Sequence, residues 1–386
     1  MGFIRLIYNF LLFFSLVIVL PVWIFLNKKR GYSIGLRERV VMKKENLPTR
    51  AVWIHCASVG EIKTAMPIIE YISSKEPVIL TVFSPRAYKF AKSLNIPTTF
   101  LPFDFSFLIK KFIKTYKPKI LIVEEAEFWF NLITVSSKYI PVISINTNMP
   151  KSPFIRLFLD KISSFIVKSE ADKEVLKSFV DREKIKVCGN LKLLSKVEDK
   201  KLDIDFGEKK VIIAGSTHHP EEQILFEIYK EIKDENMILV VAPRHIERVR
   251  EIEILAEKMK LSYSLRSQTK NPKTDIYIID TIGELTSLYK YADVVFVGGT
   301  ISKVGGHNIF EPILSGKKVI IGDNYNKIRD IVEEAKKLDA VRIVKNKEEL
   351  KQAIKELLED GKLNISIKDI QRKIFSCYTE EIDKWT

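Results

Sequence analysis

The stretch DVVFVGGTISKVGGHNIFEP, residues 293–312, contains a complete transition from a strand to a helix. It begins with a short β-branched run of the kind that forms buried strands in parallel sheets. Two glycines end this run, and a second pair, Gly305 and Gly306, precedes the expected helix, whose free N–H groups can bind an anion. Asn308 and Glu311 lie one helical turn apart on the same face. Because a carboxylate would repel a phosphate, we expect Glu311 to bind ribose hydroxyls, beside a phosphate-binding loop.

The same alternation of apolar runs and helical stretches extends on both sides of this loop. After residue 50 it forms two series, separated at 195–210 by a polar, charged stretch that is typical of a linker. Strands that alternate with crossover helices build parallel sheets, so we expect two consecutive Rossmann-like α/β domains. The expected strands are 51–56, 78–83, 119–123, 141–145, 165–167 and 185–188, followed by 211–215, 237–242, 275–280, 293–298, 318–322 and 340–344.

The domain boundaries follow from these two series. We expect a membrane anchor at 1–30, a first domain at 31–200 and a second domain at 201–386. The last helical stretch, from 346 to about 383, either completes the second domain or packs on the first. In parallel sheets of this kind ligands bind beyond the carboxyl ends of the strands, so polar motifs at strand ends are the candidates for function.

An uncharged apolar run occupies the N-terminus, from Leu6 to Leu26. Its 21 residues, at about 1.5 Å of helical rise each, match the thickness of the bilayer hydrocarbon. A cleaved signal peptide is the alternative, but the run is long, contains Pro21 and lacks a small-residue cleavage site after it. We therefore expect an uncleaved, single-pass anchor. The basic residues that follow, beginning with Lys28, place the rest of the chain in the cytoplasm and can attract anionic lipids.

The composition is that of a folded protein, with 46% hydrophobic and 29% charged residues in a chain of 386. Residues 1–50 carry half of the net charge of +14, with nine Lys or Arg residues against two Glu residues. Elsewhere basic and acidic residues are interleaved without an RNA-binding signature, so no nucleic-acid partner is expected. Cys56, Cys188 and Cys377 form no CxxC pair or metal spacing, which favours a reducing compartment with Cys56 and Cys188 as small buried hydrophobes.

Glu61, in the sequence SVGE, follows the first expected strand and lies in the first turn of a helix. One interpretation is structural, because a carboxylate there complements the helix dipole and caps the backbone. The other is functional, because the same dipole keeps Glu61 ionised and available as a general base. The spacing alone does not decide between the two.

Two further groups of charged residues follow strands of the first domain. Glu124, Glu125 and Glu127 come after the run KILIV, where carboxylates are costly unless they meet cations, a metal or water. At least one of them is therefore a candidate for function, the alternative being a charge at a helix start. Lys192, in GNLK, either neutralises a phosphate or carboxylate or is a solvated surface charge.

Three strand ends of the second domain carry polar residues. Helix capping explains the segment AGSTHHPEE at 214–222, and its two adjacent histidines lack the spacing of a metal site. Pro243 and Arg244 follow the next strand, where an arginine suits phosphate or carboxylate binding. The segment DTIGEL, at 280–285, follows a third strand in the same way.

Together and in this order, the motifs resemble those of the bacterial 3-deoxy-D-manno-octulosonic acid (Kdo) transferases of lipopolysaccharide biosynthesis. These are inverting glycosyltransferases of the GT-B fold, with two Rossmann-like domains facing a cleft. The resemblance covers nearly the whole chain. The motifs that carry it are the apolar anchor, SVGE, EAEFW, GNLK, STHHPEE, PRH, DTIGEL and GGHNIFEP.

The resemblance implies a role for each motif. Glu61 is the base that deprotonates the acceptor, while Glu125 and Lys192 stabilise the transition state. The cytidine monophosphate of the donor binds to the second domain, and no metal or other cofactor is needed. The residues implied to contact it are Pro243, Arg244, Ile282, Gly283, Glu284, Asn308, Ile309, Phe310 and Glu311.

Two segments depart from the family pattern. Residues 146–150 read NTNMP where the family has a NARLS-like segment, so that Asn148 replaces an arginine. GNLK is followed by Leu193 and Leu194 instead of Phe–Asp. Both departures lie in the first domain and bear on the acceptor more than on the reaction.

The implied function is transfer of Kdo from CMP-Kdo to a lipid A precursor, lipid IVA, at the inner membrane. The implied partners are CMP-Kdo, the lipid acceptor and inner-membrane lipids. One alternative is another membrane-associated GT-B enzyme that uses a UDP-sugar, such as a glycolipid synthase or an epimerase. A second alternative is a catalytically inactive protein that binds the nucleotide-sugar without turnover.

Overall fold

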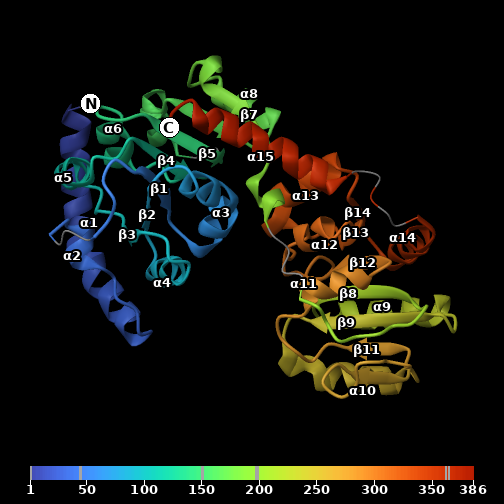
Figure 1. The fold of residues 1–386 in the computed structure, drawn as a ribbon. Helices are drawn as coiled ribbons and strands as arrows, with labels where there is room; N and C mark the ends of the chain where they lie inside the picture. Colours follow the sequence, from blue (N-terminus) through green and yellow to red (C-terminus); the bar gives the residue numbers. More distant parts are fainter. Residues whose placement is uncertain (1, 43–45, 149–151, 196–199, 361–362, 364–365) are drawn as a thin grey trace. The chain divides into compact units, whose positions relative to one another are not determined.

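The computed structural model describes residues 2–42, 46–148, 152–195, 200–360, 363 and 366–386 (Figure 1). Met149 and Pro150 of the NTNMP segment and part of the expected linker lie outside the described residues. The chain divides into two compact units. Unit 1 comprises Met1–Ser195 and Ile370–Thr386, and unit 2 comprises Lys196–Asp369. The C-terminal residues thus belong to unit 1, the second of the two positions expected for the last helix.

Unit 1 is an α/β unit built on a parallel sheet. Its strands are β1 (Val52–Cys56), β2 (Val78–Val82), β3 (Thr98–Phe100), β4 (Ile120–Glu124), β5 (Val142–Thr147), β6 (Ser164–Val167) and β7 (Ile185–Val187). Its helices are α1 (Gly2–Lys29), α2 (Leu36–Arg39), α3 (Val59–Ser73), α4 (Pro85–Ser93), α5 (Ser106–Tyr116), α6 (Phe130–Ser136), α7 (Pro153–Arg156), α8 (Glu170–Leu176) and most of α15 (Ile367–Asp383), with short 3-10 turns η1 (Leu159–Lys161), η2 (Arg182–Lys184) and η3 (Leu191–Leu194).

The strand order in unit 1 is β3-β2-β1-β4-β5-β6-β7. All residues of β1, β2, β4 and β5 are buried, as their β-branched sequences predict for strands covered on both faces. The direction of strand addition reverses between β1 and β4, which pair directly. Ligands of open parallel sheets bind beyond the carboxyl ends at such a reversal. SVGE follows β1 and the acidic run follows β4, so both motifs lie at this point.

Unit 2 repeats this architecture. Its strands are β8 (Lys210–Thr217), β9 (Met237–Pro243), β10 (Tyr263–Leu265), β11 (Ile276–Ile278), β12 (Val294–Val297), β13 (Val319–Gly322) and β14 (Val341–Val344). Its helices are α9 (Glu221–Ile232), α10 (Val249–Lys258), α11 (Leu285–Leu288), α12 (Phe310–Leu314), α13 (Arg329–Lys337) and α14 (Lys347–Asp360), with 3-10 turns η4 (Ile246–Arg248), η5 (Tyr289–Tyr291) and η6 (Asn326–Ile328). The order is β10-β11-β9-β8-β12-β13-β14, and the reversal lies between β8 and β12.

Every strand expected from the sequence is present within a few residues of its expected bounds. The structure adds two strands that the sequence did not predict, β3 and β10. Each has three residues and lies at the end of its sheet. Such short segments carry too few residues for a period-2 pattern to be recognised.

The C-terminal helix α15 is joined to unit 1 by a disulfide between Cys188 and Cys377, whose Cα atoms are 5.5 Å apart. The interpretation of Cys188 as an unpaired small hydrophobe is therefore wrong, and the cysteine argument for a reducing compartment is lost with it. The two cysteines are 189 residues apart in sequence, and only the packing of α15 beside β7 brings them together. Cys56 is free and buried.

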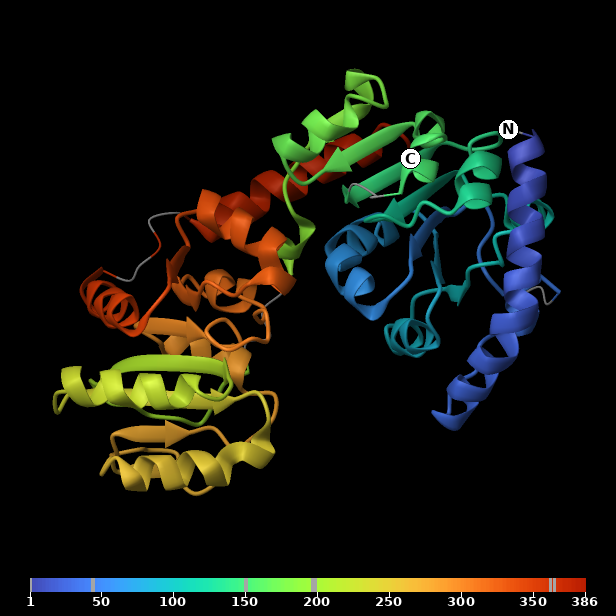
Figure 2. The ribbon, with the colours of Figure 1, turned by 180° about the vertical axis from the view of Figure 1, so that it is seen from behind.

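Helix α1 lies at one edge of unit 1 in both views of the ribbon (Figures 1 and 2). It contains 28 residues, including Pro21. Among the described residues, it is the one helix long and apolar enough to cross a bilayer, judged by length and composition. Its partly buried residues recur every three or four positions, and contacts of Arg5, Tyr8, Asn9 and Trp23 attach this face to the rest of unit 1.

Candidate active site

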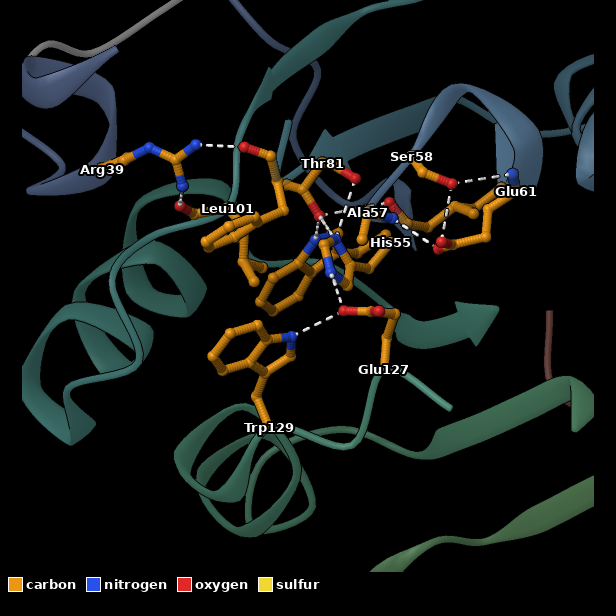
Figure 3. Close-up of polar contacts among 12 residues, drawn as sticks. Arg39, His55, Ala57, Ser58, Glu61, Thr81, Leu101, Glu127 and Trp129 are labelled. Atoms are coloured by element: carbon orange, nitrogen blue, oxygen red, sulfur yellow. Dashed lines mark hydrogen bonds and ion pairs between the residues drawn. The ribbon is translucent and has the colours of Figure 1, made fainter. Parts of the chain in front are cut away.

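Glu61 lies at the start of α3, immediately beyond the carboxyl end of β1 (Figure 3). Its carboxylate accepts hydrogen bonds from the Ala57 N–H at 2.7 Å and from the Ser58 hydroxyl at 2.8 Å. The Ser58 hydroxyl oxygen in turn accepts the Glu61 N–H at 3.2 Å, so the two residues cap the helix reciprocally. Burial raises the pKa of Glu61 above its ordinary value, although these hydrogen bonds oppose the shift. A carboxylate that is both fixed and more basic than usual suits a general base.

Three more carboxylates gather where β4 ends. Burial, reinforced by the charges of Glu124, Glu61, Glu127 and Glu125, raises the pKa of the Cys56 thiol well above its ordinary value. Four carboxylates thus lie close to the carboxyl end of β1 and give this region a negative electrostatic potential. Such a cluster is costly unless cations or protons neutralise part of it.

Glu124 is fully buried and bonded to a side chain of the neighbouring strand. Its Oε1 accepts a hydrogen bond from Asn146 Nδ2 at 3.0 Å, and Asn146 Oδ1 accepts the Leu191 N–H at 3.1 Å. Burial, followed by the charge of Glu125, raises the pKa of Glu124 well above its ordinary value. Glu124 thus connects the acidic run to the segment that carries Lys192.

Glu127 faces the buried His55 of β1 and the indole of Trp129 (Figure 3). Its Oε2 lies 3.5 Å from His55 Nε2 and accepts a 2.7 Å hydrogen bond from Trp129 Nε1. Burial raises the pKa of Glu127, but His55 and Trp129 outweigh it, so the pKa lies below its ordinary value. Its partners therefore favour the anionic form of Glu127, whereas burial disfavours the anionic form of Glu124.

Glu125 and Lys192, the two residues implied to stabilise the transition state, form an ion pair of 3.6 Å between Oε1 and Nζ. Both side chains are about a quarter to a third exposed, at 24% and 31%. Glu125 has a φ of 52°, in the left-handed region that a non-glycine residue adopts only at a cost of order 1–3 kcal/mol. In this conformation the Glu125 side chain pairs with Lys192.

A second lysine, which the sequence analysis did not single out, lies at the carboxyl end of β6. Lys168 is 8% exposed and hydrogen-bonds through Nζ to Asn148 Oδ1, at the position where the family pattern has an arginine. Its charge opposes the rise in the pKa of Glu124. The strand-end rule could have found Lys168, since it directly follows an expected strand.

In unit 2, Glu221 organises the glycine-rich loop after β12. This buried carboxylate accepts hydrogen bonds from the N–H groups of His218, Gly299, Thr300, Ile301 and Ser302, at 2.9–3.2 Å. A Cβ added to Gly298 would lie 2.6 Å from Glu221 Oε2, which explains the glycine there. These N–H groups therefore serve the loop's own structure.

The helix start at Asn308–Glu311 is also internally bonded. Asn308 Oδ1 accepts the Phe310 N–H at 3.0 Å, and Asn308 Nδ2 donates to Glu311 Oε1 at 3.1 Å. Thr286 donates to Glu311 Oε2 at 2.8 Å, which joins α12 to α11. The side chains of Ile309 and Phe310 are buried, so these two residues can offer a ligand only their backbone.

The other residues expected to bind the CMP of the sugar donor lie at neighbouring strand ends. Pro243 is buried at the end of β9, and the side chain of Arg244 is exposed. Ile282 is 90% exposed, and Gly283 has a φ of 86°. Glu284 receives two hydrogen bonds of 3.0 Å from the Arg266 guanidinium, so its carboxylate is already paired.

Three histidines meet beside Arg244, a grouping that the sequence did not indicate. His218 Nε2 and His307 Nε2 are 2.8 Å apart with stacked rings, and His245 packs against His218 at 5.6 Å between centroids. Burial, and then the charges of His218 and Arg244, lowers the pKa of His307 to about 4. Among the described residues there is no group of three or more His, Cys, Asp or Glu side chains that could hold a metal ion.

Two family models match this chain. One, described as 3-Deoxy-D-manno-octulosonic-acid transferase (kdotransferase), matches residues 34–195, and one described as Glycosyl transferases group 1 matches residues 195–374. A 3-deoxy-D-manno-octulosonic acid transferase of Aquifex aeolicus is 34% identical over 339 residues, covering 86% of this chain and 92% of that protein. The chain belongs to the Kdo transferase family. A member from Chlamydophila psittaci is 28% identical, covering 85% of this chain and 82% of its own.

The fold is shared more widely than the sequence. A UDP-GlcNAc 2-epimerase from Neisseria meningitidis superposes with a TM-score of 0.57 at 14% identity, covering 85% of this chain and 99% of its own. At that identity the likeness concerns the fold alone. This Kdo transferase therefore has the expected α/β GT-B fold, with two parallel sheets and an apolar N-terminal helix. Family membership makes it a glycosyltransferase of lipopolysaccharide biosynthesis.

Proposed function

We propose that this Kdo transferase moves Kdo from CMP-Kdo to a lipid A precursor, lipid IVA, on the cytoplasmic face of the inner membrane. The observation that supports this most directly is the position of Glu61. It lies at the strand reversal of unit 1, fixed by Ala57 and Ser58, with a pKa that burial raises. A base in that position can receive the proton of an acceptor hydroxyl.

In the proposed step, the acceptor hydroxyl oxygen attacks the anomeric carbon of Kdo from the face opposite the phosphate. The bond between that carbon and the phosphate oxygen breaks, and CMP leaves with the electron pair. Glu61 takes the hydroxyl proton and later releases it to solvent. The configuration at the anomeric carbon is inverted, because attack and departure occur on opposite faces.

Lys192 supplies positive charge close to this step in the proposal. It is paired with Glu125 and remains about a third exposed, so it can meet the carboxylate of Kdo or a phosphate of the acceptor. Glu125 holds the ammonium group in place. Lys168 adds a second cation at the same edge of the sheet, next to Asn148.

The donor's CMP is proposed to bind unit 2 at the strand reversal between β8 and β12. Arg244 and the histidines around His307 would face its phosphate, and Glu311, held by Thr286 and Asn308, would meet the ribose hydroxyls. His307, whose pKa burial lowers to about 4, would donate a hydrogen bond as a neutral imidazole without adding fixed charge. No metal ion has a role in this proposal.

Replacing Glu61 by glutamine tests the assignment of the base. Glu61→Gln keeps the side-chain shape but removes the basic oxygen, so transfer should fall at least 100-fold. CMP affinity, measured by calorimetry, should stay within about twofold, because the donor contacts proposed here belong to unit 2. Glu174→Gln, on the exposed surface of α8, is the matched control. A Glu61→Gln protein with normal turnover would rule out Glu61 as the base.

The two alternatives are separated by nucleotide preference and by turnover. Thermal shift with CMP and UDP at equal concentration should show stabilisation by CMP. A preference for UDP would favour another GT-B enzyme, and CMP binding without any transfer would favour a catalytically inactive binding protein.

A further inference from the structure

We propose that α1 lies along the membrane surface, with its outward face at the boundary between the headgroups and the acyl chains of anionic lipids, and does not cross the bilayer. The proposal rests on how α1 is attached to unit 1 and on what its free face presents. It does not depend on which sugar is transferred.

The N-terminal part of α1 is bonded to unit 1 through polar side chains. Arg5 donates to Thr134 Oγ1 at 3.1 Å, and Tyr8 donates through Oη to Asp104 Oδ2 at 2.8 Å. Asn131 Nδ2 donates to Asn9 Oδ1 at 2.8 Å. Asp104 is buried and also accepts backbone N–H groups at the start of α6. This end of the helix is therefore fixed to the folded unit.

The C-terminal part of α1 is fixed at a second place. Trp23 stacks on Phe83, with 5.8 Å between ring centroids and 20° between the planes. The buried guanidinium of Arg39 lies 5.1 Å from the Trp23 ring and 4.9 Å from the Phe83 ring. Arg39 also donates to the Ile34 carbonyl oxygen at 2.8 Å. It donates to the Leu101 carbonyl oxygen at 3.2 Å as well (Figure 3). Cation–π contacts and backbone hydrogen bonds thus hold this part of the helix to the same unit.

The helix is also partly buried between these two places. Leu12, Leu16 and Leu20 are half-buried at a spacing of four residues, in line with Tyr8 and Trp23. From Arg5 to Trp23 the helix rises about 27 Å, close to the roughly 30 Å of bilayer hydrocarbon. If α1 crossed the bilayer, the surface of unit 1 that is attached to it would therefore lie at the depth of the hydrocarbon.

That surface is unsuited to hydrocarbon. Helix α5 begins at Ser106, which accepts a hydrogen bond from Asn9, and it carries Lys110, Lys111 and Lys114 exposed to solvent. Charged side chains at the depth of the hydrocarbon are costly unless they reach the interface. A span would require either that these lysines enter the bilayer or that the bonds of Arg5, Tyr8 and Trp23 break.

The outward face of α1 suits the membrane interface instead. No charged residue occurs between Arg5 and Lys28. Phe107, 64% exposed beside the Asn9 contact, extends the apolar surface beyond the helix. Apolar faces of this length on a folded unit mark an interaction surface, and interfacial helices bury them about 5–10 Å deep. The exposed large apolar residues of α1 are Phe3, Leu6, Ile7, Phe10, Leu11, Phe13, Phe14, Val17, Ile18, Val19, Val22, Phe25 and Leu26.

Charge identifies anionic lipid as the occupant of this face. Exposed Lys28, Lys29, Arg30 and Arg37 lie at and just beyond the end of α1, and α5, which carries the three exposed lysines, begins beside Asn9 of α1. Basic groups that flank an apolar stripe complement anionic headgroups. A second copy of this chain would bring the same positive charges together, which disfavours pairing through α1.

Labelling from one side of a sealed membrane distinguishes a surface helix from a span. Gly2→Cys and Glu359→Cys are introduced separately into the full-length protein, and membrane vesicles are treated with an impermeant maleimide before and after detergent. Gly2 has open space around its Cβ position, and Glu359 is exposed on α14. The wild-type chain, with Cys56 buried and the other cysteines paired, gives the background.

The surface arrangement predicts that both cysteines react equally, whichever side is exposed. A tenfold difference between them that detergent abolishes would mean that α1 crosses the bilayer, and would overturn the proposal. Because this readout does not involve Kdo transfer, its failure is distinct from a failure of the proposed function.

Vesicle binding tests the lipid as the occupant. Phe10→Gln combined with Phe14→Gln should reduce the fraction bound to phosphatidylglycerol vesicles at least tenfold, while circular dichroism shows an intact fold. Leu94→Gln, an exposed apolar residue outside α1, should leave binding unchanged. Phosphatidylcholine vesicles should bind the wild type less. Unchanged vesicle binding by the double variant, with loss of a dimer in light scattering, would assign the face to a second copy.

Discussion

Ser58 and Glu61 cap α3 reciprocally, the Ser58 hydroxyl donating to Glu61 Oε1 at 2.8 Å and accepting the Glu61 N–H at 3.2 Å. The structural and functional interpretations of SVGE are therefore compatible. The capping box stabilises the helix, and it also fixes the carboxylate that we propose as the base.

Removing the Ser58 hydroxyl should affect both roles. Ser58→Ala is expected to destabilise unit 1 by about 0.5–2 kcal/mol through the lost cap. The lost hydrogen bond had lowered the pKa of Glu61, so that pKa should rise further and the acidic limb of the kcat/KM profile should move to higher pH. Ser58→Thr retains the hydroxyl and should resemble the wild type. If the acidic limb stayed at the same pH in Ser58→Ala, the ionisation of Glu61 would not be what sets it.

Lys192 should matter more for the chemical step than for donor binding. Lys192→Met removes the charge paired with Glu125, and kcat should fall about 100- to 1000-fold if that charge stabilises the transition state. Affinity for CMP should change little. Lys177→Met, an exposed lysine of unit 1, controls for the loss of a positive charge. A variant that loses CMP affinity and keeps kcat would place Lys192 in donor binding.

Stability should depend on pH through His307. Its pKa is lowered to about 4 by burial, while an unfolded histidine titrates near 6.5, so between these values the unfolded chain binds more protons. The stability that this group contributes is present above about pH 6.5 and is lost as the pH falls toward 4. Urea unfolding should show that the free energy of unfolding falls less between pH 7.5 and pH 5 for His307→Asn than for the wild type. His219→Asn, an exposed neighbour, should retain the full loss.

Glu221 should be needed for the shape of the glycine loop. Glu221→Gln replaces one carboxylate oxygen, a hydrogen-bond acceptor, by an NH₂ group, which is a donor. This NH₂ group would face the N–H groups of Gly299 and its neighbours, so the free energy of unfolding should fall by roughly 2–3 kcal/mol. Because the loop leads to Asn308, CMP affinity should fall as well. Glu235→Gln, on an exposed turn, should change neither quantity. Normal stability of Glu221→Gln would mean that the loop is held by other contacts.

The sequence predicted the fold because the strands in question are buried on both faces. Runs such as VVFV are almost entirely apolar and are separated by helices of regular period, so both the sheets and their ligand edges could be inferred. The sequence did not predict β3 and β10, because a strand of three residues at a sheet edge is too short to show an alternation of apolar and polar residues. Contacts between residues far apart in the chain could not be predicted from the sequence for another reason. The Cys188–Cys377 disulfide depends on tertiary packing that no local pattern encodes.

The candidate site was predictable only in part. Glu125 and Lys192 follow strands, so the strand-end rule identifies both as candidates, and in the structure they form a 3.6 Å ion pair. The histidine group around His307 was missed, because its members come from three separate strand ends. Lys168 was missed although the same rule covers it, since a single lysine after a strand is seldom distinctive.

The central claim is that this chain transfers Kdo from a CMP-linked donor to a lipid A precursor. The purified full-length protein, incubated with CMP-Kdo and lipid IVA, should convert the lipid to a product heavier by a whole number of Kdo units in mass spectrometry. Glu61→Gln should leave the lipid unmodified under the same conditions. An unmodified lipid in the wild-type reaction, together with stabilisation by UDP and not by CMP, would contradict the account.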